Sequence, residues 1–426
     1  MDKKVYNTYS ALLNSELKMA TGCTEPIAIA FAGARLRQVL GEIPDHCTVY
    51  CSGNIVKNVF AVTVPNSDGS KGIDTAAMLG IIGGDADYVL DVLHNVTPDD
   101  IALMKKLVAE GRCDCELVEG VENLYIRIEA ELGSETALVE IRDYHSNITR
   151  VEKNGEVLFD ASKDEETAAN AAVLDKTLLN VHDIFEYANT VDLAEIKDVL
   201  LNQLKCNSAI AEEGLKNPWG SQVGRTIYES PNGQTLANKA RAYAAAGSDA
   251  RMNGCPMPVV INSGSGNQGM TVSLPIYVYA KELNIDEEKM LRALALANLI
   301  SLHQKRYIGS LSAYCGAISA ATGSACGIAY MLGGDYKLIC DVITNSINTT
   351  GGMVCDGAKS SCAAKIATAL DMALLSYEMS KKERVFLPGE GLVEDSIEET
   401  IANVGRMGRD GMKSTDVEIL KIMLGK

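Results

Sequence analysis

Three cysteines in a stretch of small residues constrain this chain more than any other feature. Cys315, Cys355 and Cys362 are separated by 40 and 7 residues and lie among glycine, serine and alanine. Small neighbours let a backbone approach a bulky inorganic group closely. Three thiolates without a histidine suit a soft metal, and iron–sulfur clusters commonly use such a set. The alternative is that these cysteines fill a core, because free cysteine is among the most buried residue types.

The short interval between the last two cysteines also constrains local structure. In one straight helix, Cys355 and Cys362 would be about 10 Å apart along the axis, at ~1.5 Å per residue. That separation is too large for two irons of one cluster. We therefore expect Cys355 to lie in a loop that folds back over the helix carrying Cys362. Asp356 is then a candidate N-cap, and Lys359 would offset the charge of the cluster.

Charge and cysteine content limit the compartment and the partners. The net charge of −17 argues against nucleic acid and anionic membranes as partners. Twelve cysteines without a signal peptide predict a reducing cytoplasm and no disulfide framework. The segment 307–334 has no charged residue and is long enough to cross a bilayer. Its richness in glycine, alanine and serine favours a buried helix or helix pair instead.

Hydrophobic periodicity predicts an α+β fold in which a smaller α+β domain is inserted into a mostly all-α catalytic domain. We expect two helices in residues 1–45 that pack on the catalytic domain. Residues 46–160 contain several strand patterns and a hairpin signal at Asn154–Gly155, which predict the α+β domain. Residues 161–426, with helical patterns such as 167–190, are predicted to form the cluster-binding all-α domain.

Cys23 is the fourth cysteine with a candidate role. It lies in the sequence TGCTEP, in a tight turn before a helix that Pro26 opens. Free amides and the helix dipole at such a position stabilise a thiolate. Cys23 is therefore a candidate acid–base group or ligand, and core filling is the alternative.

A polar group of residues interrupts an apolar strand pattern over 46–65. Ser52, Asn54, Lys57 and Asn58 all lie within the sequence SGNIVKN. Side chains of these types bind carboxylate or ammonium groups, so we consider them substrate-binding candidates. The alternative is that they line a turn.

The sequence GSGNQG at 264–269 matches the G-x-G-x-x-G pattern of dinucleotide sites. A dinucleotide-binding unit also needs a second strand that ends in an acidic residue, and the helical pattern that follows does not provide one. We expect instead a nest of backbone amides in which Gly266, Asn267 and Gln268 hold a small anion such as a carboxylate. The five histidines are scattered singly, and we expect surface or packing roles for them.

Five motifs together resemble one family. They are TGCTEP at 21–26, SGNIVKN at 52–58, GSGNQG at 264–269, KRYIGSLSAYCG at 305–316 and MVCDGAKSSCAAK at 353–365. Over essentially the whole chain they are similar to the L-cysteine desulfidases, a family related to the α-chain of iron–sulfur L-serine dehydratases. The resemblance implies a β-elimination by an oxygen-labile 4Fe–4S cluster, without pyridoxal phosphate, that converts L-cysteine and water to pyruvate, ammonia and sulfide. It also implies that Cys315, Cys355 and Cys362 are cluster ligands and that Cys23 is the catalytic base.

Two alternatives to the desulfidase hypothesis stay open. An L-serine or L-threonine dehydratase would use the same cluster, although the bacterial serine dehydratases place their last two ligands eleven residues apart and this chain places them seven apart. A non-catalytic iron–sulfur redox sensor would need neither Cys23 nor two polar loops. The expected partners are a small amino-acid substrate and a second copy of the chain in a homodimer, with no nucleic acid and no membrane.

Overall fold

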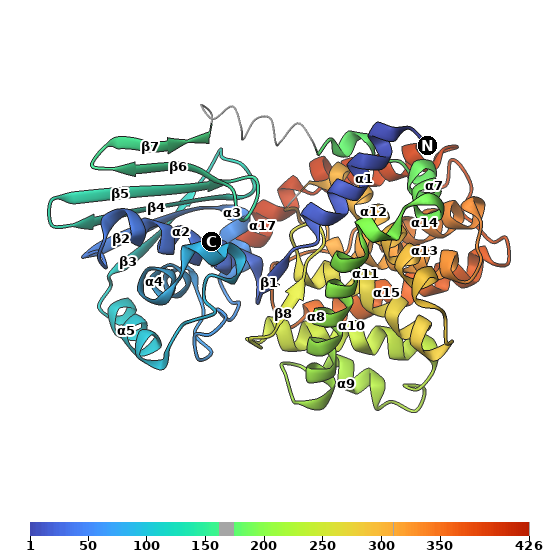
Figure 1. Ribbon diagram of the computed structural model, residues 1–426, viewed down its shortest axis with the longest axis horizontal. Coiled ribbons are helices and arrows are strands. Elements are labelled where there is room, and N and C mark those ends of the chain that lie inside the picture. Colours follow the sequence, from blue (N-terminus) through green and yellow to red (C-terminus); the bar gives the residue numbers. More distant parts are fainter. Residues whose placement is uncertain (162–173, 310, 426) are drawn as a thin grey trace.

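Two large hydrophobic cores organise the computed structural model, which describes residues 1–161, 174–309 and 311–425 (Figure 1). One core lies within a bundle of helices, on the right in Figure 1. The other lies between a six-stranded sheet and the helices that cover it, on the left. The predicted α+β class is confirmed.

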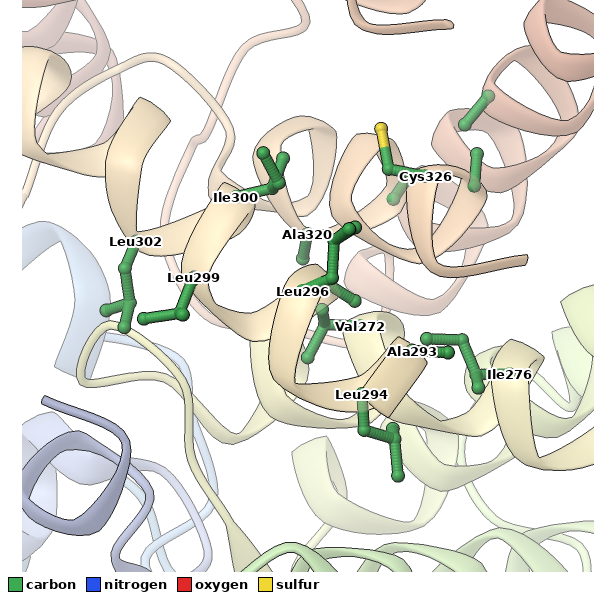
Figure 2. Close-up of a cluster of buried hydrophobic side chains, with 14 of the residues drawn as sticks. Val272, Ile276, Ala293, Leu294, Leu296, Leu299, Ile300, Leu302, Ala320 and Cys326 are labelled. Carbon is green, nitrogen blue, oxygen red and sulfur yellow. The ribbon is translucent and has the colours of Figure 1, made fainter. Parts of the chain in front are cut away.

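The helical core is built around α12 (Glu287–Ile308), which is buried along most of its length. Asp286 caps its start, two acidic residues lie in its first turn and two basic residues in its last turn, so its sequence complements the helix dipole. Figure 2 shows Leu296 and Ile300 of α12 beside Ala320 and Cys326 of α13. Gly323 permits this close approach, because a Cβ atom there would lie 2.5 Å from the Ala297 carbonyl oxygen.

The other helices of the bundle pack on α12 directly or through one another. They are α1 (Lys3–Glu16), α7 (Val181–Thr190), α8 (Lys197–Lys216), α9 (Val223–Tyr228), α10 (Leu236–Met252), α11 (Gly266–Glu282), α13 (Gly316–Met331), α14 (Tyr336–Thr350), α15 (Cys362–Ser380) and α16 (Ile397–Arg406). The predicted helix over 167–190 falls partly on 162–173, outside the described residues. Among the described helices, none is long and apolar enough to cross a membrane.

The sheet has the strand order β3-β2-β4-β5-β6-β7. The β2–β3 pair is parallel and the other pairs are antiparallel. Asn154 and Gly155 have φ values of 53° and 77° at the β6–β7 turn, which confirms the predicted hairpin. The strands are β2 (His46–Ser52), β3 (Cys113–Val118), β4 (Tyr125–Leu132), β5 (Glu135–Arg142), β6 (Ile148–Lys153) and β7 (Glu156–Asp160).

Helix α2 (Thr24–Leu40) corrects the predicted boundary at residue 46. It packs against β4, β5 and α4 (Ile73–Gly83), with α5 (Pro98–Ala109) behind α4, and so belongs to the core under the sheet. Only α1 of the two N-terminal helices packs on the helical core. The reason is that α2 is apolar on nearly all sides, which suits a helix enclosed between a sheet and a second helix.

The strand predicted over 46–65 is also corrected. It ends at Ser52, and α3 (Gly53–Val59) follows directly. Ile55, Val56 and Val59 recur at helical spacing and are buried, so the apolar pattern of this segment is that of a helix.

A short strand pair and the C-terminal helix are among the contacts that join the cores. Strand β1 (Met19–Thr21) pairs antiparallel with β8 (Pro258–Val260). The C-terminal helix α17 (Lys413–Met423) crosses to α3 and lies between the two parts of the molecule (Figure 1). The candidate site lies at this junction.

Candidate functional site

A cavity of roughly 780 Å³, counting its open mouth, lies between the two cores. The sheet side and the helical side both contribute charged and sulfur-containing side chains to its wall. The sheet side provides Cys23, Glu25, Asn58 and His145, and the helical side provides Arg251, Ser263, Gly264, Ser265, Asn267, Gln268, Lys305, Cys315, Cys355 and Cys362, among others.

The three cysteines of the sequence motif meet in this cavity. Cys315 caps the start of α13, and Cys362 is the first residue of α15. Cys355 lies in the connection from α14 to α15, as the spacing argument required. The Cys355 amide donates to the Ala313 carbonyl (2.7 Å) and the Cys315 amide donates to the Met353 carbonyl (3.0 Å), so the two cysteine segments are paired through their backbones.

Burial keeps Cys315 and Cys362 protonated when no metal is bound. It raises the pKa of Cys315 to about 12, with the neighbouring Cys355 adding to the effect, and it also raises the pKa of Cys362. A metal must therefore displace protons from these thiols when it binds.

The expected role of Asp356 as an N-cap is wrong. The N-cap of α15 is Ser361, and Asp356 forms an ion pair with Lys365. Lys359 lies 3.8 Å from the other carboxylate oxygen of Asp356. The acidic side chain therefore pairs with lysines instead of capping the helix.

Cys23 is the N-cap residue of α2, and only 2% of it is exposed. Its Sγ–H donates to Glu25 Oε2 at 2.9 Å. Burial and the adjacent Glu25 carboxylate raise the pKa of Cys23 well above its usual value, although Arg251 opposes them. The expectation of a resting thiolate is therefore wrong, since desolvation outweighs the helix N-terminus.

Glu25 is the ionised partner of this pair. Burial alone would raise its pKa, but interaction with His145 and the hydrogen bond from Cys23 outweigh burial and lower the pKa to about 2. Asn58 Nδ2 donates to Glu25 Oε1 at 3.1 Å, and His145 Nε2 lies 3.8 Å from the same oxygen. His145 therefore lines the cavity, so the expectation that every histidine has a surface or packing role is corrected.

The predicted substrate-binding residues divide into two groups. Asn58, Asn267 and Gln268 line the cavity, and the side-chain oxygen of each is buried without a hydrogen-bond partner. These oxygens are free to accept hydrogen bonds from a ligand.

The other four predicted residues lie outside the cavity wall and hold local structure instead. The Ser52 hydroxyl donates to the Asn123 carbonyl at 2.7 Å, and Asn54 Nδ2 donates to Asn123 Oδ1 at 3.5 Å. Lys57 is 2% exposed and pairs with Asp416. Gly266 begins α11 and lies against the Arg251 side chain. The Ser52 and Lys57 side chains are thus engaged within the protein, whereas Asn54 Oδ1 is buried without a partner. Direct substrate contact by these four residues stays a prediction.

The glycine loop at 264–269 is a turn into α11. Its strand, β8, pairs antiparallel with β1, so the parallel βαβ unit of a dinucleotide site is not formed there. The Asn262 side chain anchors the turn by donating to Asn298 Oδ1 at 2.9 Å, and Asn298 is in turn bonded to Gln203. All three side chains are fully buried, so the turn has one fixed position.

Known proteins are similar to this chain along nearly its whole length. Residues 88–421 match the model of the serine dehydratase alpha chain. The chain belongs to the serine dehydratase alpha chain family. It is 47% identical to a UPF0597 protein of Lachnoclostridium phytofermentans over 99% of this chain and 100% of the relative. It is 44% identical to a UPF0597 protein of Treponema denticola over 100% of this chain and 99% of the relative.

Sequence reasoning missed four charged or titratable residues that this serine dehydratase family member places in the cavity. They are Glu25, His145, Arg251 and Lys305. Glu25 and Lys305 lie inside two of the quoted motifs, which was a usable signal. Burial lowers the pKa of Lys305 to about 8, partly offset by Cys355 and Cys315. Arg251 carried a weaker signal, as a charged residue near the end of an alanine-rich helix.

Proposed function

We propose that this protein is an iron–sulfur-dependent L-cysteine desulfidase that works without pyridoxal phosphate. It would eliminate the β-thiol of L-cysteine as hydrogen sulfide, and hydrolysis of the remaining product by one water molecule would give pyruvate and ammonia. The observation that carries the proposal is the meeting of Cys315, Cys355 and Cys362 with the Cys23–Glu25 pair in one cavity. Membership of the serine dehydratase family supports a lyase reaction.

The donor set fits a 4Fe–4S cluster with three protein ligands. Cys315, Cys355 and Cys362 are three soft sulfur donors on paired, glycine-containing backbones, and this donor type favours iron–sulfur chemistry. In the described part of the chain, no three His, Cys, Asp or Glu side chains converge closely enough to hold a single metal ion. A four-iron cluster takes each cysteine on a different iron and therefore accepts a wider spacing.

Cys315, Cys355 and Cys362 would hold the cluster, and the other residues of the cavity wall would act on the substrate. When bound, such a cluster supplies a Lewis-acidic iron that favours a sulfur leaving group over a hydroxyl. Asn58, Asn267 and Gln268 present free acceptor oxygens to the ammonium group of an amino acid.

Cys23 is the proposed base for the α-proton. Its hydrogen bond to Glu25 fixes the sulfur in the cavity wall, but the resting group is a thiol. Its proton must first pass to water at the open mouth of the cavity, after which the thiolate can accept the α-proton. The positive charge of Arg251 favours that loss, and the ammonium group of a bound substrate would add to it. Glu25 holds Cys23 in position and stays ionised.

The test is an anaerobic reconstitution with iron and sulfide, followed by an assay of pyruvate and sulfide from L-cysteine. A visible cluster band with equal release of both products is the expected result. A band with faster pyruvate release from L-serine than from L-cysteine would favour the serine dehydratase, the alternative that the family supports. A band without turnover on either amino acid would favour the redox sensor and contradict the proposal.

A further inference from the structure

Arg251 is a buried cation that has no hydrogen-bond or ion-pair partner among the described residues. It lies in the last turn of α10, is 3% exposed and lines the cavity. Its Nε is buried without a hydrogen bond, and among the described residues the guanidinium group has no ion pair. A buried charge that lacks a partner costs several kcal/mol, so a fold keeps one where a ligand satisfies it.

The carboxylates near Arg251 are already engaged. Asp249, two residues earlier on α10, accepts through Oδ2 from the Gly224 amide at 2.9 Å, and its Oδ1 is buried without a hydrogen bond to Arg251 or to any other described residue. Residues two apart on a helix do not face each other, so Asp249 does not pair with Arg251. Glu25 accepts from Cys23 and from Asn58. The guanidinium group is therefore left to face the cavity, where an anion from solution can reach it.

The start of α11 is shaped around this arginine. A Cβ atom at Gly266 would lie 2.4 Å from Arg251 Nε, so only glycine leaves room for the guanidinium group there. Gly266 is also the first residue of α11, whose N-terminal end favours negative charge. The buried cation and the helix start thus favour the same kind of ligand, an anion.

Acceptors for a positive group line the same cavity. Asn267 Oδ1 and Gln268 Oε1, on the first turn of α11, are buried and have no hydrogen-bond partner. A cation and free acceptors in one enclosed cavity complement a zwitterion better than they complement a simple anion. An α-amino acid carries both groups on one carbon atom.

We propose that Arg251 binds the α-carboxylate of the amino-acid substrate and that Asn267 and Gln268 accept from its ammonium group. The planar guanidinium group can donate two parallel hydrogen bonds to a carboxylate. This inference rests on the proposed function only in taking an amino acid as the substrate. By binding the carboxylate, Arg251 would hold the α- and β-carbons of the substrate between Cys23 and the cysteines at 315, 355 and 362.

The test measures binding of an amino acid that cannot react. L-Alanine has no leaving group, and ethylamine is the same molecule without its carboxylate. Titration calorimetry on the anaerobically reconstituted protein should show binding of L-alanine and at least tenfold weaker binding of ethylamine. Arg251→Met should weaken L-alanine binding between about 10- and 100-fold, and Arg251→Lys should restore part of it. Arg241→Met is the matched control, because Arg241 is on the same helix and pairs with Asp371.

A second measurement avoids any dependence on the folding of the variants. Phenylglyoxal modifies arginines, and L-alanine should protect Arg251 of the wild-type protein from it, as read by mass spectrometry. Ethylamine should give no protection. Equal affinity of wild type and Arg251→Met for L-alanine, or modification of Arg251 unchanged by L-alanine, would overturn the inference.

Failure of the inference and failure of the proposed function give different results. If Arg251→Met keeps the KM of wild type for L-cysteine, the desulfidase proposal stands and the inference fails. If wild type binds L-alanine through Arg251 and yet releases no pyruvate from L-cysteine, the inference stands and the proposed function fails. If Arg251→Met loses the visible cluster band while its affinity for L-alanine is unchanged, Arg251 serves the metal site and the inference is overturned.

Discussion

Lys57, which is buried, and Asp416, which is half-buried, form an ion pair of 2.5 Å that joins α3 to the C-terminal helix α17. Lys57 Nζ also donates to the Cys355 carbonyl at 3.3 Å, and Asp416 Oδ2 accepts from the Ala313 amide at 2.9 Å. The pair therefore contacts the backbones of both paired cysteine segments. Lys57, predicted as a substrate-binding residue, is in this structure a residue that positions Cys355.

Lys57→Met should destabilise the protein by about 3 kcal/mol in the free energy of unfolding, because it leaves Asp416 without its partner. Urea denaturation followed by circular dichroism measures the change. The double variant Lys57→Met/Asp416→Leu should recover most of the loss, since both charges are then gone. Lys197→Met is the control, because its pair with Glu287 is exposed and should contribute nothing measurable. A loss no larger than that of the control would contradict this role.

Serine at any one of positions 315, 355 and 362 should reduce the iron bound after anaerobic reconstitution. The reason is that a hydroxyl is a harder and weaker ligand for iron–sulfur chemistry than a thiolate. Iron analysis and the visible spectrum measure the change, with circular dichroism to verify the fold. Cys340→Ser is the control: Cys340 is half-buried on α14, and this variant should bind as much iron as wild type. Full iron content in one of the three variants would remove that cysteine from the ligand set.

Cys23→Ser should lower turnover of L-cysteine at least 100-fold while the cluster absorption stays unchanged, because the base is lost and the ligands remain. Initial rates of pyruvate release and the visible spectrum, recorded on the same sample, measure the two properties. Cys340→Ser again serves as the control. An unchanged rate would remove Cys23 from the mechanism, and a lost spectrum would instead make it a ligand.

Glu25 should make folding sensitive to acid. Its pKa falls from 4.5 to about 2 on folding, so its contribution is fully present above about pH 4.5 and is lost as the pH falls toward 2. The contribution is on the order of 3 kcal/mol. Urea denaturation at a series of pH values should show a steeper loss for wild type than for Glu25→Gln. Glu42→Gln, at an exposed position, should follow wild type. Parallel curves for wild type and Glu25→Gln would refute the assignment.

The cysteine part of the site was predictable because it depends on spacing. The spacing of seven residues from Cys355 to Cys362 excludes one straight helix for two ligands of one cluster, and the structure has Cys355 in the connection before α15. The protonation state of Cys23 was not predictable in the same way. Its helix position is visible in the sequence, but the desolvation that raises its pKa comes from segments packed around it.

The sequence also could not predict which helix packs in which of the two cores. The apolar pattern of α2 shows that it is buried, and it does not show which partner covers it. Arg251 illustrates the same limit for the site. Its position on a helix is evident from the pattern, whereas its lack of a carboxylate partner depends on contacts between distant segments.

The Lys57–Asp416 pair has a consequence for the order of events during synthesis. Chains are made from the N-terminus, so all three cavity cysteines leave the ribosome before Asp416 does. Until then, the Ala313 amide lacks its acceptor and Lys57 lacks its counter-charge. During synthesis, the thiols are therefore present before α17 can hold the backbones of their segments in place. We expect iron to be loaded only after α17 has docked.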